Sequence, residues 1–382
     1  MIEFRTHRSI RDIPRAEWDA LLGEDPPPHS RWEFFEAFEC TGCVGARAGW
    51  IPCPITLSRE QQLLAIAPAY IKTNSDGEFV FDHSWARFSE ERLRLPYYPK
   101  LILAVPFTPA SGPRVLVGPS AAGPEVFAAL NTGLQQLSHQ LEVSSVHILL
   151  PEPAQVSAFL ETDLDHRYGL QYHWRNAGYC SFDDFLSRFS AKRRHQIRHE
   201  RRALERQNIQ LEVITGSDWS PRFVDLAYTF YTSTVHKYFW GRQYLNRQFF
   251  EHLCHVMKDA LLMVVAKERG TKNYVGGAFN LVGGGALYGR YWGAVEEREF
   301  LHFNVCYYKG IEECIARKLT LFEPGAGGGH KQARGFEPTV THSFHYIRHP
   351  AFREVIHDFL ERERAKVDEY LSQERPVLKP LT

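Results

Sequence analysis

Residues 322–336, FEPGAGGGHKQARGF, combine residue types that are typical of a ligand-binding loop. They follow an apolar run that predicts the end of a strand, and they include five glycines. Glycine permits positive φ and a close approach of the backbone to a ligand. Exposed N–H groups beside lysine and arginine favour an anion. We predict that Gly325, Gly327, Lys331 and Arg334 form the floor of a binding site; the alternative is a flexible loop with two solvated cations.

Three residues in this part of the chain could carry a proton. Glu323 ends the predicted strand, His330 lies within the loop, and His345 lies on a further predicted strand, residues 340–347. Histidine is the usual proton carrier near neutral pH. Glu323 could instead be hydrogen-bonded to the glycine loop. Neighbouring histidines at 342 and 345 point to opposite faces of a strand, so we expect no metal site.

Aromatic residues interleaved with cations suggest the wall of a cleft. Tyr291 and Trp292 lie on a predicted strand, residues 286–293, whose Gly289 and Gly293 would leave backbone open to a ligand. Lys237 and Trp240 lie where a predicted helix ends. The alternative is that these aromatic rings belong to the core.

A predicted helix over residues 182–207 carries a large excess of positive charge. Arg193, Arg194 and Arg198 recur within it at spacings that place some of them on one face. Such a surface favours a polyanion, such as RNA, anionic lipid or a phosphorylated cell-wall precursor. A solvated face that pairs with acidic residues elsewhere explains the pattern equally well.

The bulk properties are those of an ordinary globular protein. The 382 residues are 44% hydrophobic and carry no net charge, so no global field attracts nucleic acid or membrane. The N-terminus lacks the apolar segment of a secretory signal, and the apolar runs are shorter than the roughly 20 residues of a membrane helix. An odd number of scattered cysteines, seven, suits a reducing compartment. We therefore expect a cytoplasmic protein.

Hydrophobic periodicity predicts two mixed α/β units of related design. The first covers residues 1–170 and the second residues 171–382, which begins with the basic helix and ends with a C-terminal helix. Each unit is expected to combine helices with a sheet in which an antiparallel meander is followed by a crossing helix. Residues 79–85, FVFDHSW, are among the predicted strands of the first unit.

Four stretches resemble the GNAT acyltransferase superfamily in its doubled form, and within it the FemAB-like group. They are FLSRFSAKRRHQIRHERR from Phe185, TSTVHKYFWGRQYLNRQFF from Thr232, YGRYWGAVEEREFLHFNVCYYKGIE from Tyr288, and FEPGAGGGHKQARGFEPTVTHSFHYI from Phe322. The resemblance implies a tandem GNAT-like fold and an N-acyltransferase or aminoacyltransferase. Acyl-CoA or aminoacyl-tRNA would be the donor and an amine, on a small molecule or a cell-wall precursor, the acceptor. Any contact with a membrane would be peripheral.

Aminolysis of an ester or thioester needs a base for the amine proton. Glu323, His330 or His345 would serve, while Lys331 and Arg334 would hold a phosphate or carboxylate. Two features depart from the resemblance: Asn304 stands where relatives have Glu, and GAVEEREFLHF replaces the pyrophosphate loop of ordinary GNAT enzymes. Both departures also suit a second class of function, a non-catalytic module that binds a polyanion on the same fold.

Overall fold

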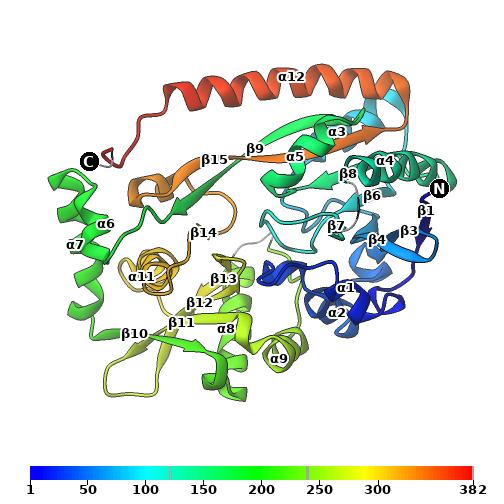
Figure 1. The fold of residues 1–382 in the computed structure, drawn as a ribbon. Coiled ribbons are helices and arrows are strands. Elements are labelled where there is room, and N and C mark those ends of the chain that lie inside the picture. Colours follow the sequence, from blue (N-terminus) through cyan, green and yellow to red (C-terminus); the bar gives the residue numbers. More distant parts are fainter. Residues whose placement is uncertain (120, 122, 238–240, 381–382) are drawn as a thin grey trace. The chain divides into compact units, whose positions relative to one another are not determined.

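A computed structural model describes residues 1–119, 121, 123–237 and 241–380. Its contacts divide the chain into two compact units (Figure 1). Unit 1 consists of Met1–Leu170 and Val340–Gln373, and unit 2 consists of Gln171–Thr339 and Glu374–Thr382. None of the described helices is long and apolar enough to cross a membrane.

Unit 1 is built on two sheets. Its strands are β1 (Glu3–Thr6), β2 (Trp50–Pro52), β3 (Ile55–Arg59), β4 (Gln62–Ala67), β5 (Ala69–Lys72), β6 (Lys100–Leu103), β7 (Leu116–Val117), β8 (Ser145–Leu149) and parts of β9 (Asp165–Arg175) and β15 (Glu337–Ile347). Its helices are α1 (Arg15–Asp19), α2 (Trp32–Cys40), α3 (His83–Phe88), α4 (Gly123–Gln140), α5 (Pro153–Leu160) and α12 (Pro350–Gln373). One sheet has the order β1-β3-β4-β7, and the other contains β15-β8-β6-β5-β2.

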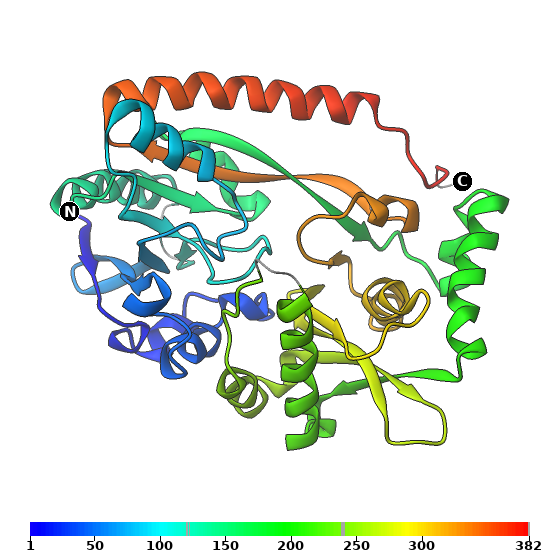
Figure 2. The same cartoon turned by 180° about the vertical axis from the view of Figure 1, so that it is seen from behind.

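The apolar stripe of α12 packs within unit 1. Phe352, Ile356 and Leu360 are buried against Trp85 of α3 and Tyr97. Figure 2 shows α3 beside the first turns of α12. The chain therefore divides between residues 170 and 171, where the sequence predicts a boundary, but the C-terminal helix packs in the first unit, not the second.

Unit 2 is built on an antiparallel meander. Its strands are β10 (Ile209–Thr215), β11 (Leu261–Glu268), β12 (Tyr274–Gly283), β13 (Ala286–Ala294) and β14 (Leu321–Glu323), followed by the end of β9. Its helices are α6 (Phe182–Ser187), α7 (Ala191–Arg206), α8 (Pro221–Lys237), α9 (Arg247–Val256), α10 (Leu301–Phe303), a π-helical turn (Asn304–Tyr308), α11 (Lys309–Ala316) and a 3-10 helix (Gly329–Arg334). Strand β14 pairs parallel with β13, so α10–α11 form the crossover. Both units are mixed α/β, which agrees with the tandem GNAT-like fold class predicted from the sequence.

Two predicted elements differ in the structure. The basic helix is interrupted, because the Ser181 and Ser190 side chains each cap a separate helix, α6 and α7. The predicted strand at residues 79–85 is wrong. Phe79 has a positive φ of 60°, which ends an extended run, and α3 begins at His83.

Candidate functional site

The glycine loop joins β14 to the 3-10 helix of unit 2. Gly325, Gly327 and Gly328 all have positive φ, between 72° and 90°, a backbone conformation that residues other than glycine rarely adopt. Lys331 is buried, and its Nζ donates to the carbonyl oxygens of Gly325 at 2.6 Å and Ala326 at 3.3 Å. This lysine therefore closes the loop onto itself.

Arg334 is also buried and engaged within unit 2. Its Nη2 donates to both carboxylate oxygens of Glu200 on α7, at 2.9 and 3.0 Å, and its Nη1 donates to the His330 carbonyl oxygen. The guanidinium lies 3.3 Å from the ring centroid of Phe303. Arg334 thus ties the loop to α7 and α10, a structural role that the sequence did not predict; its anion-binding role stays a prediction.

Asn304 has a structural role close to the same pair. Its Nδ2 donates to the carbonyl oxygens of Glu200 at 2.9 Å and Phe300 at 3.0 Å, and the side chain is buried. Tyr308 donates its hydroxyl hydrogen to the Glu200 carboxylate. The residue that departs from the family pattern therefore joins α10 to α7.

Two neutral imidazoles lie near the loop. His330 is exposed, and its Nε2 is 2.9 Å from the Tyr307 hydroxyl. Burial, with Arg334 and Lys331 nearby, lowers the pKa of His330. The ring of His302 lies 5.9 Å from that of His330, and burial, aided by the same positive charges, lowers the pKa of His302 to about 4. His302 was missed by the sequence reasoning, although it follows the unusual GAVEEREFL junction.

A pocket of about 900 Å³ opens beside His302. It is formed by the end of α8, the end of β13 and the segment that leads into α10. Its lining residues are Ser233, Thr234, Lys237, Trp292, Ala294, Val295, Glu296, Glu297, Arg298, Glu299, Phe300, Leu301, His302 and Phe303. Of the predicted wall residues, Lys237 and Trp292 lie in this lining, with the ring of Trp292 4.6 Å from that of His302.

Tyr291 is not part of this lining. Tyr291 packs against Tyr231 and Phe250, with ring centroids 5.0 and 6.1 Å away. Trp240 lies outside the described residues.

The glycines of β13 make room for protein, not for a ligand. A Cβ on Gly293 would overlap the carbonyl oxygen of Phe230, so this glycine lets α8 lie close to the sheet. A Cβ on Gly289 would come within 3.1 Å of the Pro324 backbone. The expectation that these glycines leave backbone open to a ligand is therefore wrong.

The predicted basic residues of α7 differ in the groups that they contact. Arg194 donates to the carbonyl oxygens of Phe189 and Ser187, while Arg198 pairs with Asp183 at 3.0 Å. Arg193 donates to Gln196. Beside them lies a groove of about 520 Å³, whose cationic lining residues are Arg198, Arg201, Arg202, Arg269 and Lys309.

His345 lies in unit 1, whereas Glu323 and His330 lie in unit 2. Glu323 is buried at the end of β14. The ring of His345 is buried, with its Nδ1 2.6 Å from Nδ1 of His147 on β8 and its Nε2 2.9 Å from the Ser343 hydroxyl. Burial lowers the pKa of His345 well below its usual value, so the ring is neutral.

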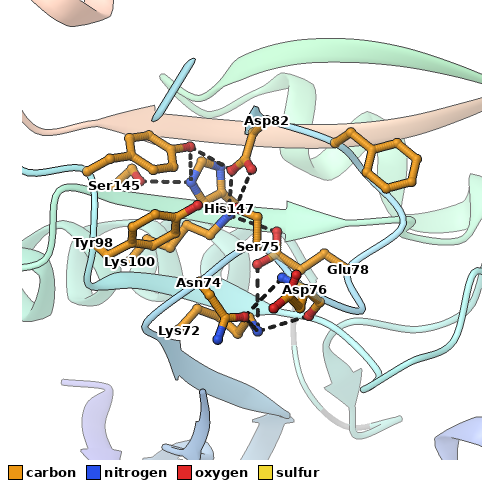
Figure 3. Close-up of polar contacts among 12 residues, drawn as sticks. Lys72, Asn74, Ser75, Asp76, Glu78, Asp82, Tyr98, Lys100, Ser145 and His147 are labelled. Carbon is orange, nitrogen blue, oxygen red and sulfur yellow. Dashed lines mark hydrogen bonds and ion pairs between the residues drawn. The ribbon is translucent and has the colours of Figure 1, made fainter. Parts of the chain in front are cut away.

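His345 belongs to a buried polar network in unit 1, most of which is drawn in Figure 3. Its members are Lys72, Ser75, Glu78, Asp82, Tyr97, Lys100, His147 and His345, and all of them are buried. Lys72 is paired with Lys100 across β5 and β6, and His147 with His345 across β8 and β15. Residues from neighbouring strands and from the segment after β5 therefore lie together in one buried polar layer.

Lys100 is the centre of this network. Its Nζ donates to Ser75 at 2.9 Å, to Glu78 at 2.8 Å and to Asp82. Burial alone would lower the pKa of Lys100, but the two carboxylates raise it. Burial would likewise raise the pKa of Asp82, yet Lys100 holds it well below its usual range. Lys100 and Asp82 are therefore a charged pair.

The sequence contained one signal for this network. His147 interrupts an apolar run that predicts a buried strand, and a buried polar group needs partners. Lys72 and Lys100 gave no signal, because a lysine at a strand end normally reaches solvent.

The sequence matches the FemAB-like family, described as peptidoglycan biosynthesis/recognition, over residues 9–378. The chain therefore belongs to the FemAB-like family. No curated protein sequence matches it.

Solved structures match the chain at low sequence identity. FemX is 12% identical, with 92% of this chain and 99% of FemX covered and a TM-score of 0.57. L-PGS from Bacillus licheniformis is 10% identical (89% and 98% covered, TM-score 0.48). A tandem GNAT protein from the clavulanic acid biosynthesis pathway is 9% identical (92% and 99% covered, TM-score 0.45). The match to FemX shows the fold, and the family model shows the family to which the chain belongs.

Proposed function

We propose that the protein transfers an aminoacyl group to an amine on a cell-wall precursor, with the donor bound in the unit 2 pocket. The observation that carries this proposal is the pocket of about 900 Å³ beside the neutral imidazole of His302. A pocket of this size suits a drug-sized ligand. The family description supports a peptidoglycan-related acceptor.

The charges of the pocket favour an aminoacyl donor over coenzyme A. Glu296, Glu297 and Glu299 line it, against Lys237 and Arg298. Lys237 pairs with Glu297 and Arg298 with Glu296, so the pocket has one carboxylate in excess at the junction where ordinary GNAT enzymes bind a pyrophosphate. The ammonium of an aminoacyl ester would instead be attracted.

The transfer requires no covalent enzyme intermediate. The amine nitrogen attacks the ester carbonyl carbon, the bond to the ester oxygen breaks, and that oxygen leaves with a proton. A base must take the proton that the amine loses. His330 is our first candidate, because its neutral ring is exposed and is oriented by Tyr307. Glu323 is the second candidate.

The test is to incubate the protein with charged tRNAs, acyl-CoAs and a UDP-linked cell-wall peptide, and to follow amide formation. We expect product from an aminoacyl-tRNA. His330→Gln should lower kcat about 100-fold or more while leaving KM for the donor unchanged. The matched control is His139→Gln on α4 of unit 1. Consumption of acyl-CoA alone would overturn the aminoacyl assignment, and consumption of neither donor would overturn the transfer.

A second function is favoured by the groove beside α7, which would bind a polyanion without catalysis. Binding of tRNA that weakens with salt, with no amide formed from any donor, would support this function over the first.

A further inference from the structure

The polar network of unit 1 contains a carboxylate oxygen that lacks a hydrogen-bond partner among the described residues. This atom is Oε1 of Glu78, whose side chain is 1% exposed. The other oxygen, Oε2, accepts a hydrogen bond from Lys100 at 2.8 Å. Leaving a buried polar atom unpaired is costly, and nearly all such atoms in folded proteins have a partner. A donor is therefore missing at this point.

Lys72 supplies the nearest cation. Its Nζ lies 4.0 Å from Oε1 of Glu78, and its side chain is 0% exposed. Nζ donates to Asn74 Oδ1 at 3.2 Å and to the Asp76 carbonyl oxygen at 3.0 Å, and it lies 4.1 Å from the ring centroid of Trp50. An ammonium has three N–H donors, so one remains. A separation of 4.0 Å is too long for a direct hydrogen bond, but it suits two bonds through one water molecule.

Several charged and titratable groups surround this pair from the elements packed against it. Those that act on the pair itself are Asp76 in the same segment, Asp82 at the start of α3, Tyr97 and Tyr98 before β6, and Lys100 on β6. His147 on β8, Arg167 on β9 and His345 on β15 act on one another further along the network. Lys100 and Asp82 hold each other charged, and burial keeps both histidines neutral. Lys72 and Glu78 are left as the members whose protonation can change.

We propose that Lys72 and Glu78 form a buried proton-exchange site that holds one water molecule between them. At neutral and higher pH the pair is an ammonium and a carboxylate; at lower pH it is an ammonium and a carboxylic acid. In the exchange, a hydronium ion of the solvent gives up a proton, its O–H bond breaks, and an O–H bond forms on Oε1 of Glu78 with an electron pair of the carboxylate. Burial favours the uncharged acid, whereas the cation of Lys72 favours the carboxylate, so the two groups are coupled.

The environment of both groups supports this proposal. Burial raises the pKa of Glu78 to about 7, although Lys100 lowers it. Burial lowers the pKa of Lys72 to about 7, although Glu78 raises it. The pKa values of the two groups are therefore similar and lie near neutral pH. Groups poised in this way, with a specific charge partner, are characteristic of functional sites.

A chain of contacts leads from the exchange site to β15. From Glu78 it runs through Lys100 to Asp82, whose Oδ2 accepts from the Tyr97 hydroxyl at 2.6 Å. The Tyr97 hydroxyl lies 3.5 Å from Nε2 of His147, whose Nδ1 shares a hydrogen with His345. A change of charge at Glu78 thus reaches across the whole polar layer. The proposal concerns unit 1 alone and holds whether or not a donor binds in unit 2.

The experiment is infrared difference spectroscopy of the full-length protein as a function of pH. A protonated carboxylic acid has a carbonyl stretching band that a carboxylate lacks. We expect this band at pH 6 in the wild-type protein and its disappearance with a midpoint near pH 7. Glu78→Gln should remove the band, whereas the matched control Glu91→Gln, an exposed carboxylate, should leave it. If Glu78→Gln removes no acid band, Glu78 is ionised throughout and the proposal is overturned.

Two variants of Lys72 test the coupling in opposite directions. Lys72→Met removes the cation, so the midpoint of the Glu78 band should move up by about 1–3 pH units. Lys72→Arg keeps a cation that does not release its proton, so the midpoint should move down. A midpoint that is unchanged in either folded variant would overturn the exchange. If one variant fails to fold, the other still decides, because each has its own expected direction.

Discussion

The polar centres of the two units contain the same residue types, but they differ in their exposure to water. In unit 2, His330 is exposed, and the pocket that His302 lines has carboxylates and cations in its lining. In unit 1, the network is buried throughout, and its Lys100 is paired with Glu78 and Asp82. An exposed centre can change its charge with little effect on the fold, but a buried one cannot. We therefore propose substrate binding for unit 2 and proton exchange for unit 1.

The largest effect is expected at the centre of the unit 1 network. Lys100→Met leaves the Glu78 and Asp82 carboxylates buried without their main partner, which should destabilise unit 1 by about 3–5 kcal/mol. The matched control is Arg59→Met, which breaks an exposed ion pair with Glu125 and should change stability far less, because water already solvates both charges. Urea unfolding, with hydrogen exchange to locate the unfolding unit, measures both. Equal losses of stability in the two variants would show that burial does not determine the cost of losing the cation.

A smaller effect is expected at the buried pair of unit 2. Arg334→Met leaves Glu200 buried, but Gln196 and Tyr308 still donate to it. We expect a loss of about 1.5–3 kcal/mol in the free energy of unfolding. Hydrogen exchange should increase in residues 329–336. If stability is unchanged and only ligand affinity falls, Arg334 is a binding residue after all.

The sequence predicted the regular elements better than the polar contacts. The pattern of apolar residues predicted the strand at residues 286–293, which is β13, and a C-terminal helix, which is α12, because burial of their apolar faces drives their formation. It did not show that Phe352 and Ile356 of α12 pack against Trp85, a contact between residues far apart in the chain. The glycine loop was recognised by composition. That Lys331 would turn inward to its own loop depends on loop geometry, which composition does not contain.

The Gly293→Ala variant tests whether β13 contacts α8 or a ligand at this position. Gly293→Ala places a methyl group against the Phe230 carbonyl oxygen, so the helix must move. We expect a loss of about 1–3 kcal/mol in thermal or urea unfolding. The matched control, Gly270→Ala, meets open space but has a positive φ of 74°, so its cost should come from backbone strain alone, about 1 kcal/mol. A fully stable Gly293→Ala protein would contradict the close approach of α8.

The pH dependence of stability tests whether Glu78 of unit 1 is protonated in the folded protein near neutral pH. Because its folded pKa, about 7, lies above its usual value of 4.5, its contribution is fully present below pH 4.5 and is lost as pH rises towards 7. Relative to Glu78→Gln, the wild-type free energy of unfolding should fall by up to about 1.4 kcal/mol per pH unit in this window. Urea unfolding of both proteins at pH 5, 6 and 7 measures the difference, and a constant difference would place Glu78 among ordinary ionised carboxylates.

The smallest effect on stability, and a clear effect on binding, is expected on the basic face of α7. Arg194 donates to backbone carbonyls where α7 begins, so it should be left intact, whereas Arg193 and Arg202 can be changed to Glu. Their substitution should alter stability by no more than about 0.5 kcal/mol. If this face binds tRNA, each lost phosphate contact should flatten the slope of log affinity against log salt by about 0.7–0.9. Reversal of Arg47 and Arg92 in unit 1 is the matched control, because it changes net charge equally without touching α7. An identical salt slope in both double variants would mean that the charge of α7 is a solvated surface, and tRNA would then have to be bound elsewhere.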